Sequence, residues 1–269
     1  DNYRFLLSSD FGKLNVLIKA HLEDWSGIVQ PVGSIGLFKN PATQAPCTVS
    51  EAGSTSCTDA FGYNSGSNDF YDVKVNNNSP HDTDSKGFSL NLTGQLNADT
   101  TLVSVTSWDT LKRQHAFNCD GSPSRLCEGN LGLKNDVITQ ELRMHHQMGD
   151  HYLIAGAFLL DESIVQDNYN DILRDLRGVT PQAVTFIYDN QIEVGSSALF
   201  AQYDYRFSTQ TTFTAGLRYT SESTDYESIT HLNVGTDPND YVGLTIPFYQ
   251  VSGSQDDNKW SGKLAVNHQ

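Results

Sequence analysis

The sequence is short of basic residues, and this shortage excludes whole classes of protein. Its 17 lysines and arginines face 32 aspartates and glutamates, so the 269 residues carry a formal net charge of −15. Nucleic-acid binding needs basic stripes that neutralise phosphates, and the sequence contains none. The same balance disfavours a polybasic attachment to anionic lipid head groups. We expect a polar surface that is acidic and solvated, and no nucleic-acid partner.

Long apolar runs are also absent. No stretch approaches the roughly 18 to 20 apolar residues that a membrane-spanning helix needs, so a helical membrane protein is excluded. A transmembrane β-barrel is not excluded, because each of its strands needs only about 9 to 11 residues, every second one apolar.

Cysteine is scarce, and its four copies form two close pairs, Cys47 with Cys57 and Cys119 with Cys127. Both pairs lie in stretches rich in Gly, Ser, Thr and Pro. Neither has the CxxC spacing of a zinc site, and no nearby histidine completes one. Local disulfides that close short loops fit this spacing better, and they imply an oxidising compartment. We therefore expect two disulfides and no metal site.

What the sequence does contain is alternation of apolar and polar residues. In one stretch Leu199, Ala201 and Tyr203 alternate with Gln202 and Asp204. This period of two is typical of a β-strand with one apolar and one polar face. The same alternation is found in residues 14–22, 88–96, 198–207 and 213–220. The sequence therefore predicts an all-β protein.

Short turns join the predicted strands in pairs, and long connections separate the pairs. The short turns fall at residues 10–13, 97–100, 147–150 and 208–210. The long connections span about residues 26–86, 118–135, 166–191 and 228–258. Barrels of the outer membrane alternate in this way, because their periplasmic turns are short and their extracellular loops are long. We predict a transmembrane antiparallel up-and-down β-barrel with those four long connections outside the cell.

The strand count predicts that residues 1–269 form a partial barrel domain. Four hairpins and the opening strand of a fifth make about nine strands, whereas bacterial single-chain barrels have an even number. The pattern of residues 1–5 is typical of the middle of a strand, and residues 260–269 have the pattern of a strand that no turn follows. We expect a larger barrel that continues on both sides.

Aromatic residues gather near the ends of the predicted strands. They are Trp25, Trp108, Tyr152, Tyr203, Tyr205, Phe207, Tyr219 and Tyr226. Pairing across the strands of a soluble sheet would account for any one of them. Their clustering favours the aromatic girdles that transmembrane barrels carry at the two membrane interfaces.

Three stretches resemble one family, the TonB-dependent receptors. Residues 100–109 (TTLVSVTSWD) resemble a family strand that leads into a Thr-Ser-aromatic pattern, and residues 139–143 (TQELR) resemble its Gln-Glu-Leu-Arg strand. Residues 198–205 (ALFAQYDY), followed by TAGLRYT at 214–220, resemble a common barrel signature of these receptors. The resemblance covers nearly all the strands, including WSGKL at 260–264, and none of the long connections.

The resemblance implies transport rather than catalysis. A receptor of this family captures a scarce nutrient, such as a siderophore–iron complex, haem, cobalamin or an oligosaccharide, and imports it with energy from TonB. The implied location is the bacterial outer membrane. The implied partners are outer-membrane lipid and lipopolysaccharide, the TonB complex and a small nutrient ligand. The plug domain, the TonB box and the C-terminal strands of the family have no counterpart in these residues. We expect no enzyme activity and no cofactor.

Polar residues on the alternating strands are candidates to face the barrel lumen. They are Lys19, His21, Asn91, Gln95, Gln202, Asp204, Arg206 and Arg218. The lumen of such barrels is polar. These side chains could hold a plug and solvate a substrate, or simply fill a wide barrel, and alternation does not separate the two.

The sequence contains no catalytic or metal-binding motif that favours an enzyme over a transport receptor. His145 and His146 are adjacent, so a strand points them to opposite faces and they cannot converge on one metal. Glu141 shares a face with His145, but no third ligand is evident. The sequence has no G-x-S-x-G elbow, P-loop or HExxH motif. Three alternatives stay open: a passive porin, an outer-membrane hydrolase and a soluble β-sandwich adhesin.

Overall fold

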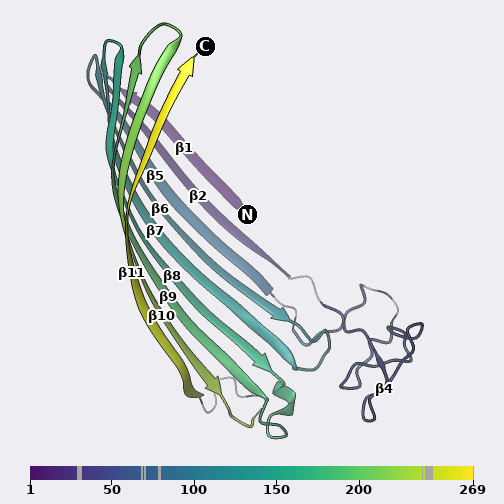
Figure 1. Ribbon diagram of the computed structural model, residues 1–269. Coiled ribbons are helices and arrows are strands. Elements are labelled where there is room, and N and C mark those ends of the chain that lie inside the picture. The colour runs from purple at the N-terminus through teal and green to yellow at the C-terminus, as the bar shows by residue number, and fades with distance from the viewer. Residues whose placement is uncertain are drawn as a thin grey trace.

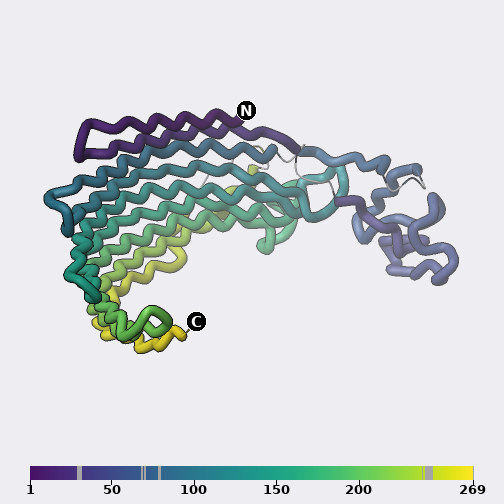
Figure 2. Tube along the Cα trace, turned by 90° about the horizontal axis from the view of Figure 1, so that it is seen from above, coloured from purple at the N-terminus to yellow at the C-terminus, as the bar shows by residue number. Residues whose placement is uncertain are grey.

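The computed structural model describes residues 1–28, 32–67, 69, 71–77, 80–237, 239 and 245–268. Most of them form one antiparallel sheet of nine strands, which bends into an open arc when it is seen from above (Figure 2). Its strands are β1 (Asn2–Phe11), β2 (Leu14–Ile28), β5 (Pro80–Asn97), β6 (Thr100–Asn118), β7 (Cys127–Met148), β8 (His151–Ile172), β9 (Val184–Arg206), β10 (Thr211–Asn233) and β11 (Thr245–His268).

Two small elements lie in the connections between these strands. A two-stranded sheet, β3 (Phe38–Asn40) with β4 (Ala45–Pro46), lies between β2 and β5. A short 3-10 helix, η1 (Arg174–Leu176), follows β8. No helix in the described ranges is long and apolar enough to cross a membrane.

The order of strands in the large sheet follows the chain, β1-β2-β5-β6-β7-β8-β9-β10-β11. Every neighbouring pair is antiparallel. The prediction of an all-β, up-and-down sheet of about nine strands is therefore confirmed.

All four short turns lie at one end of the sheet, at the top of Figure 1. The pairings that close three of them are Phe11 with Leu14, Asn97 with Thr100, and Met148 with His151. Gly12 and Gly149 take positive φ angles of 66° and 59°, a backbone region that glycine enters without steric cost. The long connections are at the opposite end, because each antiparallel strand carries the chain across the sheet.

The strands extend further than the alternation predicts, so the long connections are shorter than expected. The sequence assigned several segments to connections that the structure has as strand in the large sheet, and they are residues 26–28, 80–86, 118, 127–135, 166–172, 184–191, 228–233 and 245–258. Polar and apolar residues are mixed in these extensions, as in Val184, Phe186 and Ile187 beside Asp189 and Asn190, and this interrupts the period-two signal. The backbone ladder nevertheless continues there, because every added pair of residues satisfies its peptide groups.

The cross-strand register separates the side chains into an apolar face and a polar face. On β9 and β10 the apolar face carries Leu199, paired with Tyr219, and Leu217, paired with Ala201. In the other strands it includes Phe5, Leu7, Val16, Ile18, Phe88, Leu90, Leu92, Leu102, Trp108, Ile138, Leu142, Leu153, Leu159, Trp260, Leu264 and Val266.

The apolar face is the more exposed of the two. Leu199 and Leu217 are 66% and 54% exposed, whereas Ala198, on the polar face next to Leu199, is 5% exposed. Bending a sheet crowds the side chains on its inner surface and spreads those on its outer surface. The polar face is therefore the inside of the arc, and the apolar face is the outside.

Three of the aromatic residues assigned to girdles lie on the polar face instead. Trp25 packs edge-on against His81, with ring centroids 4.6 Å apart, and the hydroxyl of Tyr152 lies 2.7 Å from His145 Nδ1. The third is Tyr226, which pairs with Ile192. Nearness to a strand end does not determine the face, since a shift of one residue reverses it. Trp108, Tyr203, Tyr205 and Tyr219 lie on the apolar face as expected.

Two glycines of the polar face give a test of the strand packing. A methyl group at Gly156 would lie 2.6 Å from the carbonyl oxygen of Leu142 and 2.6 Å from the Phe200 ring, whereas at Gly216 the nearest atom is 3.7 Å away. We expect Gly156→Ala to lower the free energy of unfolding by about 1 to 3 kcal/mol through overpacking. Gly216→Ala is the matched control and should be close to neutral. Urea unfolding of the protein in detergent micelles measures both, and equal effects would contradict the packing described.

Candidate functional site

All eight lumen candidates lie on the polar face of the sheet. Lys19 and Asn91 are two register positions apart on neighbouring strands β2 and β5, and Gln202 is paired with Gly216 beside Arg218. The candidates form two groups, Lys19, His21, Asn91 and Gln95 on β2 and β5, and Gln202, Asp204, Arg206 and Arg218 on β9 and β10. Strands β6, β7 and β8 separate the groups. The sequence therefore predicted correctly which residues share a face of the sheet. The structure does not gather all eight of them into one pocket.

His21 has a charged partner that the sequence analysis missed. Its Nε2 lies 3.5 Å from Oδ1 of Asp109, which is on β6. Gly87 stands between them on β5, and a Cβ atom at that position would overlap both side chains. The pair bridges three strands because the middle one has no side chain. Extending the alternation through residues 101–117 would have placed Asp109 on this face.

Arg218 lies against aromatic rings rather than beside an acid. Its guanidinium carbon is 5.7 Å from the centre of the Phe158 ring and 5.8 Å from that of Phe200, and its Nε donates a hydrogen bond to Thr220 at 3.1 Å. Cation–π contacts of this kind stabilise by about 0.5 to 2 kcal/mol, depending on solvation. Phe158 and Phe200 are apolar residues inside a polar wall, and sequence alternation gave no reason to single them out.

The adjacent histidines of β7 point to opposite faces, as strand geometry predicts. His145 lies on the polar face beside Tyr152, while His146 lies on the other face, with Nδ1 2.9 Å from the hydroxyl of Thr100. Glu141 is engaged by Arg143 at 2.8 Å. In the ranges that the structure describes, no three His, Cys, Asp or Glu side chains gather in a way that could hold a metal ion.

Both cysteine pairs are disulfide-bonded in the structure. Cys47–Cys57 closes a loop within the long connection between β2 and β5, and Cys119–Cys127 closes the connection between β6 and β7. Residues 32–67 and 71–77 project from the loop end of the sheet as a knob with little regular structure (Figure 1). The first disulfide lies within that knob, and the second lies at the rim of the sheet.

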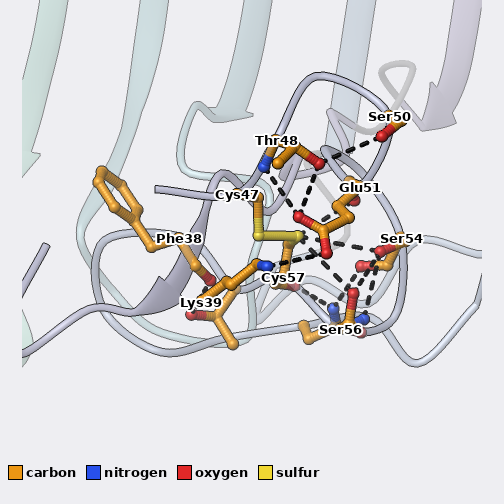
Figure 3. Close-up of a disulfide and its surroundings, with 11 residues drawn as sticks. Phe38, Lys39, Cys47, Thr48, Ser50, Glu51, Ser54, Ser56 and Cys57 are labelled. Atoms are coloured by element: carbon orange, nitrogen blue, oxygen red, sulfur yellow. Dashed lines mark hydrogen bonds and ion pairs between the residues drawn. A yellow bond between two sulfur atoms is a disulfide. The ribbon is translucent and has the colours of Figure 1, made fainter. Parts of the chain in front are cut away.

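A small ionic network surrounds the first disulfide (Figure 3). Glu51 accepts hydrogen bonds from the backbone amide of Thr48 at 2.9 Å and from its hydroxyl at 2.7 Å. Lys39 Nζ lies 2.8 Å from the other carboxylate oxygen. Lys39 and Thr48 stabilise the ionised form and hold the pKa of Glu51 at about 2, well below its ordinary value. The knob is therefore tied by a covalent bridge and by a carboxylate that stays charged.

Buried charges join the other connections into one rim. Asp171 and Arg174 are fully buried, and Arg174 pairs with both Asp171 and Glu128. Arg177 also pairs with Asp171, and it donates a hydrogen bond to the carbonyl oxygen of Asp237 at 3.2 Å. Charged groups are buried in this way only when they are paired, because an isolated charge would lose its hydration without compensation.

The rim includes the ends of the neighbouring loops. Arg125 binds Asp175 at 2.7 Å and Asn239 at 3.2 Å, and Asn76 of the knob donates a hydrogen bond to Glu128 at 2.5 Å. Residues from all four connections therefore meet at the loop end of the sheet. The sequence did not predict this network, since its members are spread over residues 76–239 and share no local pattern.

Seven of the nine strands of the large sheet are 18 to 24 residues long. The sheet has an exposed apolar band outside and a polar face inside. Together these features define a section of a transmembrane β-barrel. The family model for the TonB-dependent receptor-like β-barrel matches residues 42–269. The chain belongs to this family. No curated protein sequence matches the chain.

Two solved structures share this fold. The ferric yersiniabactin uptake receptor FyuA from Yersinia pestis is 12% identical, with a TM-score of 0.62 over 98% of this chain and 34% of that one. The open form of the ferric-catecholate import receptor Fiu from E. coli K12 is 13% identical, with a TM-score of 0.58 over 99% of this chain and 45% of that one. The chain thus spans less than half the length of either receptor. The family and these structures are transport receptors and not enzymes, in agreement with the sequence-based expectation.

Removing one disulfide tests its role in the loops. We expect Cys47→Ser/Cys57→Ser to destabilise the knob by about 2 to 3 kcal/mol, because a closed loop of this length restricts the unfolded chain. Limited proteolysis should then cut within residues 32–67 at lower protease concentration. Cys119→Ser/Cys127→Ser is the matched control, since it should expose the rim near residues 119–126 and leave the knob resistant. Identical cleavage of both variants would show that neither bridge acts locally.

Proposed function

We propose that this chain is part of the barrel of an outer-membrane receptor that imports a scarce nutrient with energy from the TonB complex. The observation that carries the proposal is the division of one curved sheet into an apolar outside and a polar inside, in a chain of the TonB-dependent receptor-like family. A bilayer requires the apolar outside, and an aqueous or plugged lumen requires the polar inside.

The proposed orientation follows from the two ends of the sheet. The short turns at residues 10–13, 97–100, 147–150 and 208–210 lie together and would face the periplasm. The connections that hold the disulfides and the buried ionic rim lie at the other end and would face outward, where barrels carry their long loops. Cys47, Cys119 and Tyr169 all belong to this end, whereas Tyr241 is outside the described residues.

The polar face would line the lumen. Lys19, His21 and Asp109 offer polar or charged groups on β2 and β6, and Gln202, Asp204 and Arg206 offer them on β9. Gln202 donates a hydrogen bond to Asp204 at 3.1 Å, so part of this polarity is satisfied within the wall. The wall would contact a plug and hydrate a passing ligand.

The substrate classes to test are siderophore–iron, haem, cobalamin and oligosaccharide. The two similar structures are a ferric yersiniabactin receptor and a ferric-catecholate receptor, which makes iron complexes the first choice. A passive porin would share the barrel but would need no energy from TonB. The β-sandwich alternative is disfavoured, because the described strands form one large sheet and not two stacked sheets.

Uptake measurements test the transport proposal. The full-length receptor, expressed in a strain without its own siderophore receptors, should import at least one radiolabelled iron complex, and deletion of TonB should abolish that import. Import that persists without TonB would indicate a porin. A receptor that imports haem, cobalamin or an oligosaccharide but no iron complex would correct the substrate class alone.

Substitutions at two neighbouring residues test the assignment of the faces. Ala201 lies on the apolar face between Ala155 and Leu217, while Gln202 lies on the polar face. We expect Ala201→Arg to cost about 2 to 4 kcal/mol if the residue is near the bilayer midplane, because its charge would enter hydrocarbon. Gln202→Arg, the control, should be nearly neutral. Reversible unfolding from lipid vesicles measures both, and the opposite ranking would reverse the two faces.

A further inference from the structure

Two histidines that are far apart in the sequence meet on the polar face of the sheet. His81 on β5 and His115 on β6 are partners in the cross-strand register, and the centres of their rings are 4.7 Å apart. Side chains directly opposite each other on neighbouring strands point to the same face, so the two imidazoles lie side by side. The sequence analysis missed this pair, because residue 81 falls in a segment that it assigned to a connection.

Apolar side chains flank the two rings and restrict them. Trp25 on β2 lies over Gly27, where a Cβ atom would be 3.0 Å from the indole, and it packs edge-on against His81 with ring centres 4.6 Å apart. Gly27 is the register partner of His81, so the indole occupies the space beside that imidazole. On the other side of the pair, Leu131 of β7 is the register partner of His115. Strands hold such a site more precisely than loops do.

The surroundings of the pair contain a positive charge and no carboxylate. The hydroxyl of Thr83 lies 3.4 Å from His81 Nε2, which is the long end of the hydrogen-bond range. No aspartate or glutamate of the described strands β5, β6 and β7 lies on this face between Asp109 and the loop end. Arg113 does lie there, two residues before His115.

The pair is far from the apolar band. His115 is seven residues further along β6 than Trp108, a distance along the strand of roughly 23 Å at about 3.3 Å per residue. Tryptophan at the edge of an apolar band marks the membrane interface. In the proposed orientation the two histidines therefore lie in the outer mouth of the barrel, which an arriving ligand passes first.

The spacing of the rings fits two imidazoles that share one metal ion. A metal ion about 2.0 Å from a ring nitrogen is about 3.2 Å from the centre of that ring, so two rings at neighbouring coordination positions have centres about 4.5 to 5.2 Å apart. The separation of 4.7 Å between His81 and His115 lies in this range. Imidazole nitrogen suits divalent ions such as Cu²⁺, Ni²⁺ and Zn²⁺, and Cu²⁺ is bound most tightly of the three.

Two side chains leave most coordination positions of such an ion open, so the remaining donors must arrive with the ligand. Arg113 disfavours a bare cation and favours carboxylate donors, which a guanidinium binds through paired hydrogen bonds. A ferric complex that is saturated with oxygen donors offers no position to an imidazole. The chemistry of the site therefore differs from that of the iron complexes considered above.

We propose that His81 and His115 each supply a ring nitrogen to a Cu²⁺, Ni²⁺ or Zn²⁺ ion that reaches the barrel mouth in a carboxylate chelate with open coordination positions. The carboxylates of the chelate face Arg113, and Trp25 and Leu131 keep the imidazoles in place. The proposal rests on the proposed transport function, and it adds divalent metal chelates to the substrate classes named there.

Binding of Cu²⁺–nitrilotriacetate to the full-length receptor in detergent micelles tests the proposal. This probe is a negatively charged carboxylate chelate with open coordination positions. His81→Gln and His115→Gln should each weaken its binding by about a hundredfold or more, because the second imidazole acts as an intramolecular partner of the first. The matched control, His145→Gln/His146→Gln, removes two imidazoles that lie on opposite faces, and it should bind like the unchanged receptor.

Two further measurements define the bound species. The electron paramagnetic resonance spectrum of the bound Cu²⁺ should show two imidazole nitrogens in the unchanged receptor and in the control, and one in either single variant. Arg113→Gln should bind the chelate up to about fivefold more weakly, as expected for an exposed charge pair, and should not weaken the binding of aqueous Cu²⁺. An Arg113→Gln variant that binds the chelate as before would overturn the carboxylate part of the proposal.

The site itself is overturned if both single variants keep the affinity of the unchanged receptor, or if the control loses as much as they do. His81 packs against Trp25, so if His81→Gln fails to fold, His115→Gln decides alone. Uptake of iron complexes with energy from TonB is measured separately. A receptor that imports its nutrient but does not bind the copper chelate would lose this site and keep the transport function.

Discussion

The continuous ladder of backbone hydrogen bonds is the constraint on which the rest of this structure depends. Within a bilayer no water is available for a free amide or carbonyl group, and each unsatisfied group costs several kcal/mol. Long antiparallel strands meet this requirement through their neighbours, so the side chains are left free to alternate. This explains why a sequence with an acidic overall charge and no long apolar run folds into a sheet with an apolar exterior. It also explains why Gly156 lies where neighbouring backbone approaches closely.

The curvature of the sheet gives the side chains of its two faces different surroundings. On the outer face, large apolar side chains such as Leu199 and Leu217 spread apart and stay exposed for contact with lipid. On the inner face, crowding brings together groups from strands that are far apart in sequence, such as His21 with Asp109 and Arg218 with Phe158. The polar wall is therefore a network of local pairs, and it agrees better with a surface for a plug and a hydrated ligand than with one binding pocket.

At the loop end of the sheet, disulfides and buried ion pairs hold the structure together. Beyond the apolar band the strands continue with mixed polar and apolar residues. Their ends are joined by disulfides and by paired charges that are buried together. Asp171, Arg174 and Arg177 hold connections that would otherwise be independent. The rim contacts the projecting knob through Asn76 and Glu128, so these ion pairs also support the base of the knob.

The sequence by itself determined the strands, their pairing through short turns and the separation of the faces. Gln202 and Leu199 could be assigned to opposite faces because alternation is a local property of the chain. The disulfides could be predicted because each pair is close in sequence. Three kinds of feature could not be predicted: the face of Trp25 and Tyr152, the continuation of strands through residues 166–172 and 228–233, and the His21–Asp109 pair. These features depend on the register between strands, which is set by many backbone hydrogen bonds across the sheet. Only the tertiary structure decides that register, since contacts between residues distant in sequence leave no periodic signal along the chain.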